Sequence, residues 1–156
     1  MNDVVVSTGI FKSNIKVASH ETIKYQTLFW LFVTGSIIGY LLEGFWSVVK
    51  AGHWDHHSST IWGPFCIIYG VGAVAAYLIS ELLSGKNVLV NFIVFALSGG
   101  LVEYFGSLIQ ERLLGSVSWK YDDNFMNIGG RVSLSMAIAW GALGLLFMRF
   151  LFPHLK

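Results

Sequence analysis

Gly99-Gly100-Leu101-Val102-Glu103-Tyr104-Phe105-Gly106 places a carboxylate inside an apolar stretch that is long enough to cross a membrane. The surrounding segment, residues 88–109, is almost continuously apolar, and a bilayer span needs about 20 such residues. A charge at the bilayer centre costs about 3 kcal/mol on insertion scales, so it normally faces a partner or a wet cavity. Gly99 and Gly106 lie one turn before and after Glu103, where they allow another helix to approach the acid closely.

The composition of the chain is that of a polytopic membrane protein. Hydrophobic residues make up 54% of the 156 residues and charged residues only 12%, against about 25% in soluble proteins. The mean hydropathy is +0.63. A net charge of +1 without a basic cluster gives no support for nucleic-acid binding. The single cysteine, Cys66, excludes an intramolecular disulfide.

Apolar segments separated by polar connectors predict an all-α integral membrane protein with four transmembrane helices. The predicted helices cover residues 26–49, 63–83, 88–109 and 132–152, and an N-terminal tail covers residues 1–25. The tail lacks a continuous apolar run, so we expect no cleavable signal peptide, and it is either a frayed tail or an interfacial helix. In the long connector between the third and fourth helices, an apolar piece at 113–117 is expected either at the interface or re-entering the membrane.

Small residues recur at helical spacing and predict close packing between helices. Glu43 follows Gly39 by one turn in the first helix, just as Glu103 follows Gly99 in the third. The second helix is predicted to begin with Pro64 in its first turn, because proline loses no hydrogen bond there. The residues that we assign to structural motifs are Gly39, Gly63, Pro64, Gly70, Gly72, Gly99 and Gly106.

Alternation of the four spans brings most of the unusual polar groups to one side of the membrane. Glu43 and Glu103 each lie six residues before the predicted end of a helix, and these two helices run in the same direction. At 1.5 Å per residue, both carboxylates are roughly 9 Å inside the same membrane face. Both long connectors emerge on that face. The candidate substrate-binding residues are Glu43, Tyr69, Glu103, Tyr104, Glu111, Trp119, Tyr121, Asn127 and Arg131.

Besides a shallower position in contact with headgroup water, two interpretations of the two carboxylates are open. In the first, Glu43 and Glu103 pair with Arg131 or Arg112 and only hold the bundle together, since buried ions need partners. In the second, the carboxylates bind a substrate or an ion. The two roles are compatible, because a ligand can interrupt a network of salt bridges.

The connector after the first helix contains potential metal ligands, but their spacing matches no zinc signature. Adjacent His56 and His57 cannot easily turn to one ion, so these residues and His53 are weak metal candidates in a solvated loop. The chain contains no nucleophilic triad, Walker A loop or dinucleotide fingerprint. We therefore expect no cofactor and no enzymatic activity, including that of an ATPase.

Several motifs follow one another along the chain. They are Gly39-Tyr40-Leu41-Leu42-Glu43, the segment 62–72 with Gly63-Pro64 and Ile68-Tyr69-Gly70, and then Glu103-Tyr104, Glu111, Trp119-Lys120-Tyr121 and Asn127-Ile128-Gly129-Gly130-Arg131. In this order they resemble the motifs of the ABC-transporter type IV (CmpB-like) family of bacterial membrane proteins. Ile67 replaces the usual proline of that family and Lys120 replaces the usual aspartate. The resemblance implies residence in the bacterial cytoplasmic membrane.

We predict a small permease-like transport subunit that binds a polar or cationic solute at Glu43 and Glu103. Four helices rarely enclose a complete solute path, so this function requires a homo-oligomer or a partner membrane or ATPase subunit, besides the lipid bilayer. The alternative is a non-transporting structural, sensory or lipid-interacting module whose Glu/Arg network only holds the helices together.

The basic residues predict the orientation of the chain. Six lie on the side of the N-terminus and four on the opposite side: Lys12, Lys16, Lys24, Lys86, Arg149 and Lys156 against Lys50, Arg112, Lys120 and Arg131. By the positive-inside rule, both termini are expected in the cytoplasm and the polar cluster on the outer side.

Overall fold

Four helices make up the described part of the chain, which is residues 25–54 and 63–155 of a computed structural model. They are α1 (Tyr25–Ala51), α2 (Ile67–Leu83), α3 (Val88–Leu114) and α4 (Leu134–Leu146). Two short turns extend α4, a π-helix η1 (Phe147–Leu151) and a 3-10 helix η2 (Phe152–His154). Apart from an isolated bridge between Ile128 and Val132, the regular structure of the described residues is all helical, as predicted.

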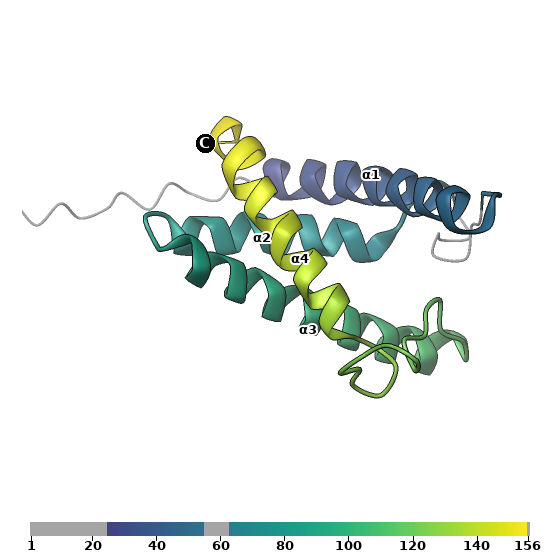
Figure 1. Ribbon diagram of the computed structural model, residues 1–156. Coiled ribbons are helices and arrows are strands. Elements are labelled where there is room, and N and C mark those ends of the chain that lie inside the picture. Colours follow the sequence, from purple (N-terminus) through teal and green to yellow (C-terminus); the bar gives the residue numbers. More distant parts are fainter. Residues whose placement is uncertain (1–24, 55–62, 156) are drawn as a thin grey trace, which may run out of the picture.

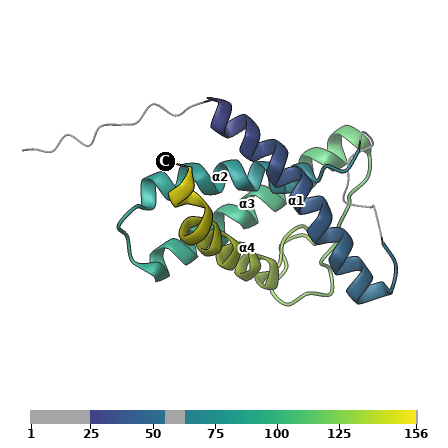
Figure 2. The same cartoon turned by 90° about the horizontal axis from the view of Figure 1, so that it is seen from above.

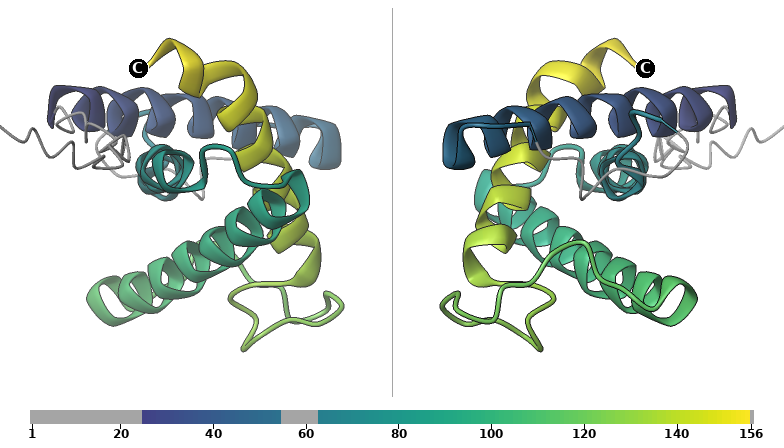
Figure 3. Two further views of the ribbon diagram at one scale, coloured as in Figure 1. Left: turned by 90° about the vertical axis from the view of Figure 1, so that its left-hand side faces the viewer. Right: turned by 90° about the vertical axis from the view of Figure 1, so that its right-hand side faces the viewer.

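The helix α2 lies between α1 and α3. Figure 1 shows α1 and α2 side by side in opposite directions, with α3 running in the same direction as α1. Seen from above, α4 runs obliquely past α3 (Figure 2). Figure 3 shows α1 and α3 diverging on either side of α2, while α4 extends from beside α3 to beside α1. There Leu31, Tyr77 and Phe152 form a buried apolar cluster that joins α1, α2 and the end of the chain.

Three of the helical segments are long and apolar enough to span a membrane. They are Tyr25–Ala51, Val88–Leu114 and Leu134–His154, the last of which includes η1 and η2. The fourth, α2, is apolar but has only 17 residues. Its length of roughly 25 Å is less than the hydrocarbon core of about 30 Å. The chain is therefore a helical membrane protein, with one helix shorter than predicted.

The short length of α2 reflects its N-terminus, where the sequence prediction was wrong. Pro64 precedes the helix instead of lying in its first turn, and Cys66 is the N-cap residue, with φ −102° and ψ 94°. The backbone N–H of Cys66 donates to the carbonyl of Ser36 in α1 at 2.9 Å. This hydrogen bond to a neighbouring helix holds the chain extended, so that α2 begins at Ile67, one turn later than the proline suggests.

The end of α3 also differs from the prediction, because the helix continues to Leu114. Gly115 then adopts φ +68° and its N–H donates to the carbonyl of Glu111 at 2.9 Å. This is the left-handed cap that glycine forms readily. The apolar piece predicted at 113–117 therefore begins as the end of α3 and its capping turn, and does not re-enter the bundle as a separate segment.

After this cap, the connector folds back along α3. The side chain of Gln110 donates to the hydroxyl of Ser118 at 2.5 Å, and the hydroxyl of Tyr121 reaches Glu103, about two turns before Gln110 in α3. The backbone N–H of Tyr121 donates to the carbonyl of Gly130 at 2.8 Å, which closes the loop. Polar groups of the connector thus cover the last turns of α3.

Trp140 of α4 packs against glycines of two other helices. A Cβ atom added to Gly72 of α2 would lie 2.5 Å from the indole ring, and one added to Gly99 of α3 would overlap it. The indole also lies against the ring of Tyr69, with centroids 5.5 Å apart and planes inclined by 35°. This one side chain therefore fixes the positions of α2, α3 and α4 relative to one another.

Other glycines of the predicted motifs occupy similar contacts. A Cβ at Gly39 of α1 would overlap the ring of Tyr69, and one at Gly70 of α2 would lie 2.6 Å from the carbonyl of Phe32. A Cβ at Gly106 of α3 would lie 2.6 Å from Cδ1 of Ile68, a flexible side-chain end. The small residues thus allow α1 and α3 to approach α2 from both sides.

Two adjacent glycines of α3 provide a test of this packing. We expect Gly99→Ala to lower the free energy of unfolding by about 1–3 kcal/mol, because the added methyl group overlaps Trp140. Gly100→Ala is the matched control, since its Cβ would meet Val132 at an ordinary 3.4 Å. It should be neutral or stabilising by up to about 1 kcal/mol through helix propensity. Equal stability of the two variants in detergent would contradict the central position of Trp140.

Candidate functional site

Two carboxylates and three aromatic side chains form a group that we call the acidic–aromatic cluster: Glu43, Tyr69, Glu103, Tyr121 and Trp140. The hydroxyl of Tyr69 donates to Oε1 of Glu43 at 2.7 Å. The hydroxyl of Tyr121 donates to Oε1 of Glu103 over a longer 3.4 Å, and the indole of Trp140 lies beside the same carboxyl group. The five side chains come from the four helices and the connector, so all of these elements meet at the cluster.

Glu103 is the buried acid of this cluster. Only 7% of its surface is exposed, and its Oε2 atom has no hydrogen-bond partner in the described part of the chain. The hydrogen bond that its Oε1 accepts from Tyr121 is longer than the 2.5–3.0 Å typical of O–H···O bonds. Because a buried charge is costly unless it is paired, this carboxyl group requires a proton or a cation.

Tyr121 supplies a neutral hydroxyl to the cluster. Burial and the neighbouring carboxylates of Glu103 and Glu43 raise the pKa of the Tyr121 phenol above its ordinary value. The phenol therefore stays protonated at neutral pH and acts as a hydrogen-bond donor. Its position follows from the folded connector, which the sequence pattern alone did not predict.

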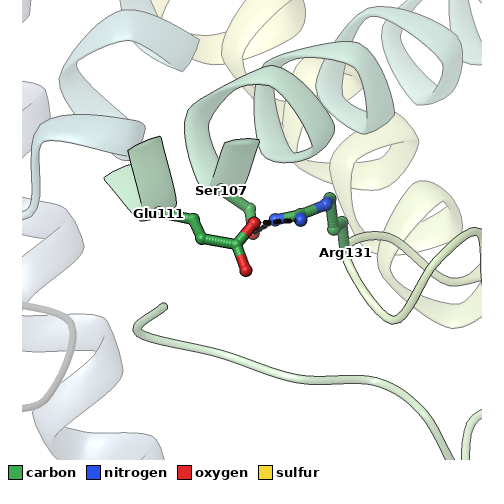
Figure 4. A network of polar contacts seen from close by, with 3 residues as sticks. All are labelled: Ser107, Glu111 and Arg131. Atoms are coloured by element: carbon green, nitrogen blue, oxygen red, sulfur yellow. Dashed lines mark hydrogen bonds and ion pairs between the residues drawn. The ribbon is translucent and has the colours of Figure 1, made fainter. Parts of the chain in front are cut away.

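Arg131 pairs with Glu111 and not with either acid of the cluster. Its guanidinium donates to the hydroxyl of Ser107 at 2.9 Å and forms an ion pair with Glu111, one turn further along α3 (Figure 4). The side chain of Glu111 is 49% exposed, so this pair lies at the solvent edge of the bundle. Among residues 25–54 and 63–155, neither Glu43 nor Glu103 forms an ion pair with Arg131 or Arg112.

Two further predicted site residues shape the connector. The indole N–H of Trp119 donates to the carbonyl of Arg131 at 3.0 Å. The side-chain amide of Asn127 donates to the carbonyls of Asp122 and Asn124 at 2.9 and 3.0 Å. Its Oδ1 accepts from the N–H of Gly130 at 3.1 Å. Both side chains thus bind backbone of the connector, and neither belongs to the acidic–aromatic cluster.

Tyr104 lies next to Glu103 in sequence but turns away from the cluster. Its ring is half-buried and packs edge-to-face against Phe105, with centroids 5.6 Å apart. Trp140, in contrast, belongs to the cluster although the sequence analysis did not select it. A tryptophan in the middle of an apolar helix, facing glycines of other helices, was the available signal.

The histidine-rich connector is only partly described. Nδ1 of His53 lies 3.1 Å from the carbonyl of Ala51. His56 and His57, like the N-terminal tail, lie outside the described residues. Within the described ranges, no group of three His, Cys, Asp or Glu side chains is arranged to hold a metal ion.

These features define a helical membrane protein with a buried acid where its helices meet. The sequence profile of the family described as "Putative ABC-transporter type IV" matches residues 30–156. The match covers more than half of the chain, so the protein belongs to this family, as the sequence motifs predicted. No curated protein and no solved structure gave a significant match.

The two tyrosines provide a test of how the cluster is built. We expect Tyr69→Phe to lower the free energy of unfolding by about 1.5 kcal/mol, because it removes the hydrogen bond to Glu43. Tyr104→Phe is the matched control and should change stability by less than about 0.5 kcal/mol. Chemical unfolding of both variants in detergent compares them directly. A larger effect at Tyr104 than at Tyr69 would show that the cluster is wrongly assigned.

Proposed function

We propose that the protein is the membrane subunit of a transport system and that it binds a cation at Glu103. The observation that carries the proposal is a buried carboxyl group whose Oε2 atom has no hydrogen-bond partner among residues 25–54 and 63–155. Ionisable groups within membrane spans commonly belong to substrate or proton pathways. Glu43 lies within electrostatic reach of Glu103 and adds to the negative potential there.

The contacts of Arg131 support this function over a purely structural role for Glu103. A bundle held by a Glu103–Arg131 pair would bring the guanidinium to Glu103, whereas Arg131 contacts Ser107 and Glu111. We therefore assign the structural role to Glu111 and Arg131, and the binding role to Glu103. Both roles that the sequence analysis left open then occur in one protein, on different residues of α3.

Transport also requires components outside this chain. The sequence has no Walker A loop, so an ATPase subunit would supply the energy in an ABC-type system. The small bundle further suggests assembly with a second copy or another membrane subunit. We also propose residence in a bacterial cytoplasmic membrane, which membership of this family supports.

Binding at Glu103 can be tested through ligand-dependent stability. We expect at least one member of a panel of alkali ions, ammonium and organic amines to raise the melting temperature of the purified protein. A ligand at 100 times its Kd stabilises a folded protein by about 2.7 kcal/mol. Glu103→Gln should abolish this response while keeping or raising the basal melting temperature, because a buried amide costs less than a buried unpaired acid.

The control is Glu111→Gln, which removes the same charge from the same helix. It should lower the basal melting temperature slightly, since it breaks the ion pair to Arg131, and keep the response to cations. An unchanged response in Glu103→Gln, or a response lost equally in both variants, would contradict the proposed site.

The proposed orientation has its own test. Single cysteines at Asn87 and His53, in a Cys66→Ser background, lie in connectors on opposite sides of the bundle. With both termini in the cytoplasm, a membrane-impermeant maleimide added to intact cells should label position 53 and not position 87. Labelling of position 87 alone would show the opposite orientation, with both termini outside the cell.

A further inference from the structure

An apolar groove lies beside the acidic–aromatic cluster. Residues of all four helices and of η1 line it, and its cavity volume is about 190 Å³. Its lining on α1 extends from Leu31 to Leu42, and on α2 from Tyr69 to Ile79. Because α1 and α2 are antiparallel, Leu42 and Tyr69 lie at the same end of the groove. Trp140 also lines it, so two aromatic rings of the cluster form part of its wall.

The groove is accessible from the hydrocarbon region of the membrane. Its lining residues Ile38, Leu42 and Leu151 are 55%, 45% and 45% exposed, and all three lie in segments long enough to span the bilayer. In a bilayer, exposed apolar side chains of such segments face the lipid chains. A ligand that enters here from the bilayer keeps an apolar part in apolar surroundings throughout.

We propose that the bound cation is an amphiphilic ammonium compound, whose charged head lies on the rings of Tyr69 and Trp140 and whose single short chain occupies the groove. This inference rests on the proposed function and specifies its substrate class. The faces of tryptophan and tyrosine rings attract ammonium groups within about 6 Å of the ring centroid. The centroids of the two rings lie 5.5 Å apart. The hydroxyl of Tyr69 donates to Glu43, and the indole of Trp140 lies beside the carboxyl group of Glu103.

The charge and volume of the site select against other occupants. A phospholipid would bring its phosphate close to Glu43 and Glu103, which is unfavourable because all of these groups are negative. An inorganic cation would leave the apolar groove without a role. An apolar cavity of about 150 Å³ admits a molecule the size of benzene, so the slightly larger groove accommodates one short chain or ring.

The experiment compares two probes, octyltrimethylammonium and tetramethylammonium, which share a head group and differ in the chain. Binding is measured by equilibrium dialysis in uncharged maltoside micelles, with protein-free micelles subtracted and tetramethylammonium read by competition. We expect the octyl probe to bind at least about tenfold more tightly than the methyl probe. Glu103→Gln should weaken both.

A variant that fills the groove isolates the contribution of the probe's alkyl chain to binding. Ala76→Phe places a ring in the groove and should weaken the octyl probe at least about tenfold while changing the methyl probe less than about threefold. Ala75→Leu, at another lining position, serves if Ala76→Phe does not fold. Ala139→Phe is the matched control, because Ala139 is exposed on α4 and does not line the groove. It should change neither probe.

The outcomes separate this inference from the proposed function. Equal affinity of the two probes, or equal effects of Ala76→Phe and Ala139→Phe, would overturn the inference. Glu103-dependent binding of tetramethylammonium would then leave the proposed function intact. Failure of both probes to bind would also overturn the inference, and the response of Glu103→Gln to the wider cation panel would decide the proposed function separately.

Discussion

The close approach of three helices around the indole of Trp140 is the constraint on which the rest of the structure depends. Gly72 and Gly99 have no side chain, so α2 and α3 can both lie against this ring. Glu103 follows Gly99 by one turn and Tyr69 precedes Gly72 by about one turn. Packing at the glycines therefore brings the acid of α3 close to the tyrosine that binds Glu43 of α1. The position of the polar cluster is a consequence of apolar packing.

The polar residues of α3 divide into two groups with different surroundings. Ser107 and Glu111 lie near the solvent edge and bind Arg131, which attaches the returning connector to the helix. Glu103 lies deeper, against Tyr121 and Trp140, and its Oε2 atom has no hydrogen-bond partner in the part of the chain that the structure describes. A helix can thus use one acid to hold the fold and another, two turns away, for a ligand. If Glu103 binds a ligand as proposed, the stability of the bundle does not depend on the charge of that residue.

Much of the fold could be predicted from the sequence because membrane spans have a strong hydropathy signal. The glycine spacing around Glu103 and Glu43 also indicated which helix faces would be buried. The partner of Arg131 could not be predicted, because several acids were close enough in the expected topology. Only the path of the connector, set by the cap at Gly115, decides that it is Glu111.

The starts and ends of helices were also harder to predict, because they depend on contacts with other parts of the chain. Pro64 suggested a helix start, but a hydrogen bond between Cys66 and Ser36 of α1 keeps that segment extended. The role of Trp140 was missed because tryptophan in a membrane protein usually indicates an interface, whereas this one packs between helices. Each of these features depends on a contact between residues far apart in the chain, which local sequence patterns do not contain.

A pair of double-mutant cycles that share Arg131→Met tests most directly whether Glu103 is free of a structural partner. One cycle combines it with Glu111→Gln and the other with Glu103→Gln, each measured as the free energy of unfolding in detergent. The account predicts a coupling energy of about 0.5 kcal/mol or more for Glu111 and Arg131, and additivity within about 0.3 kcal/mol for Glu103 and Arg131. Strong coupling between Glu103 and Arg131, with stability recovered in the double variant, would contradict it.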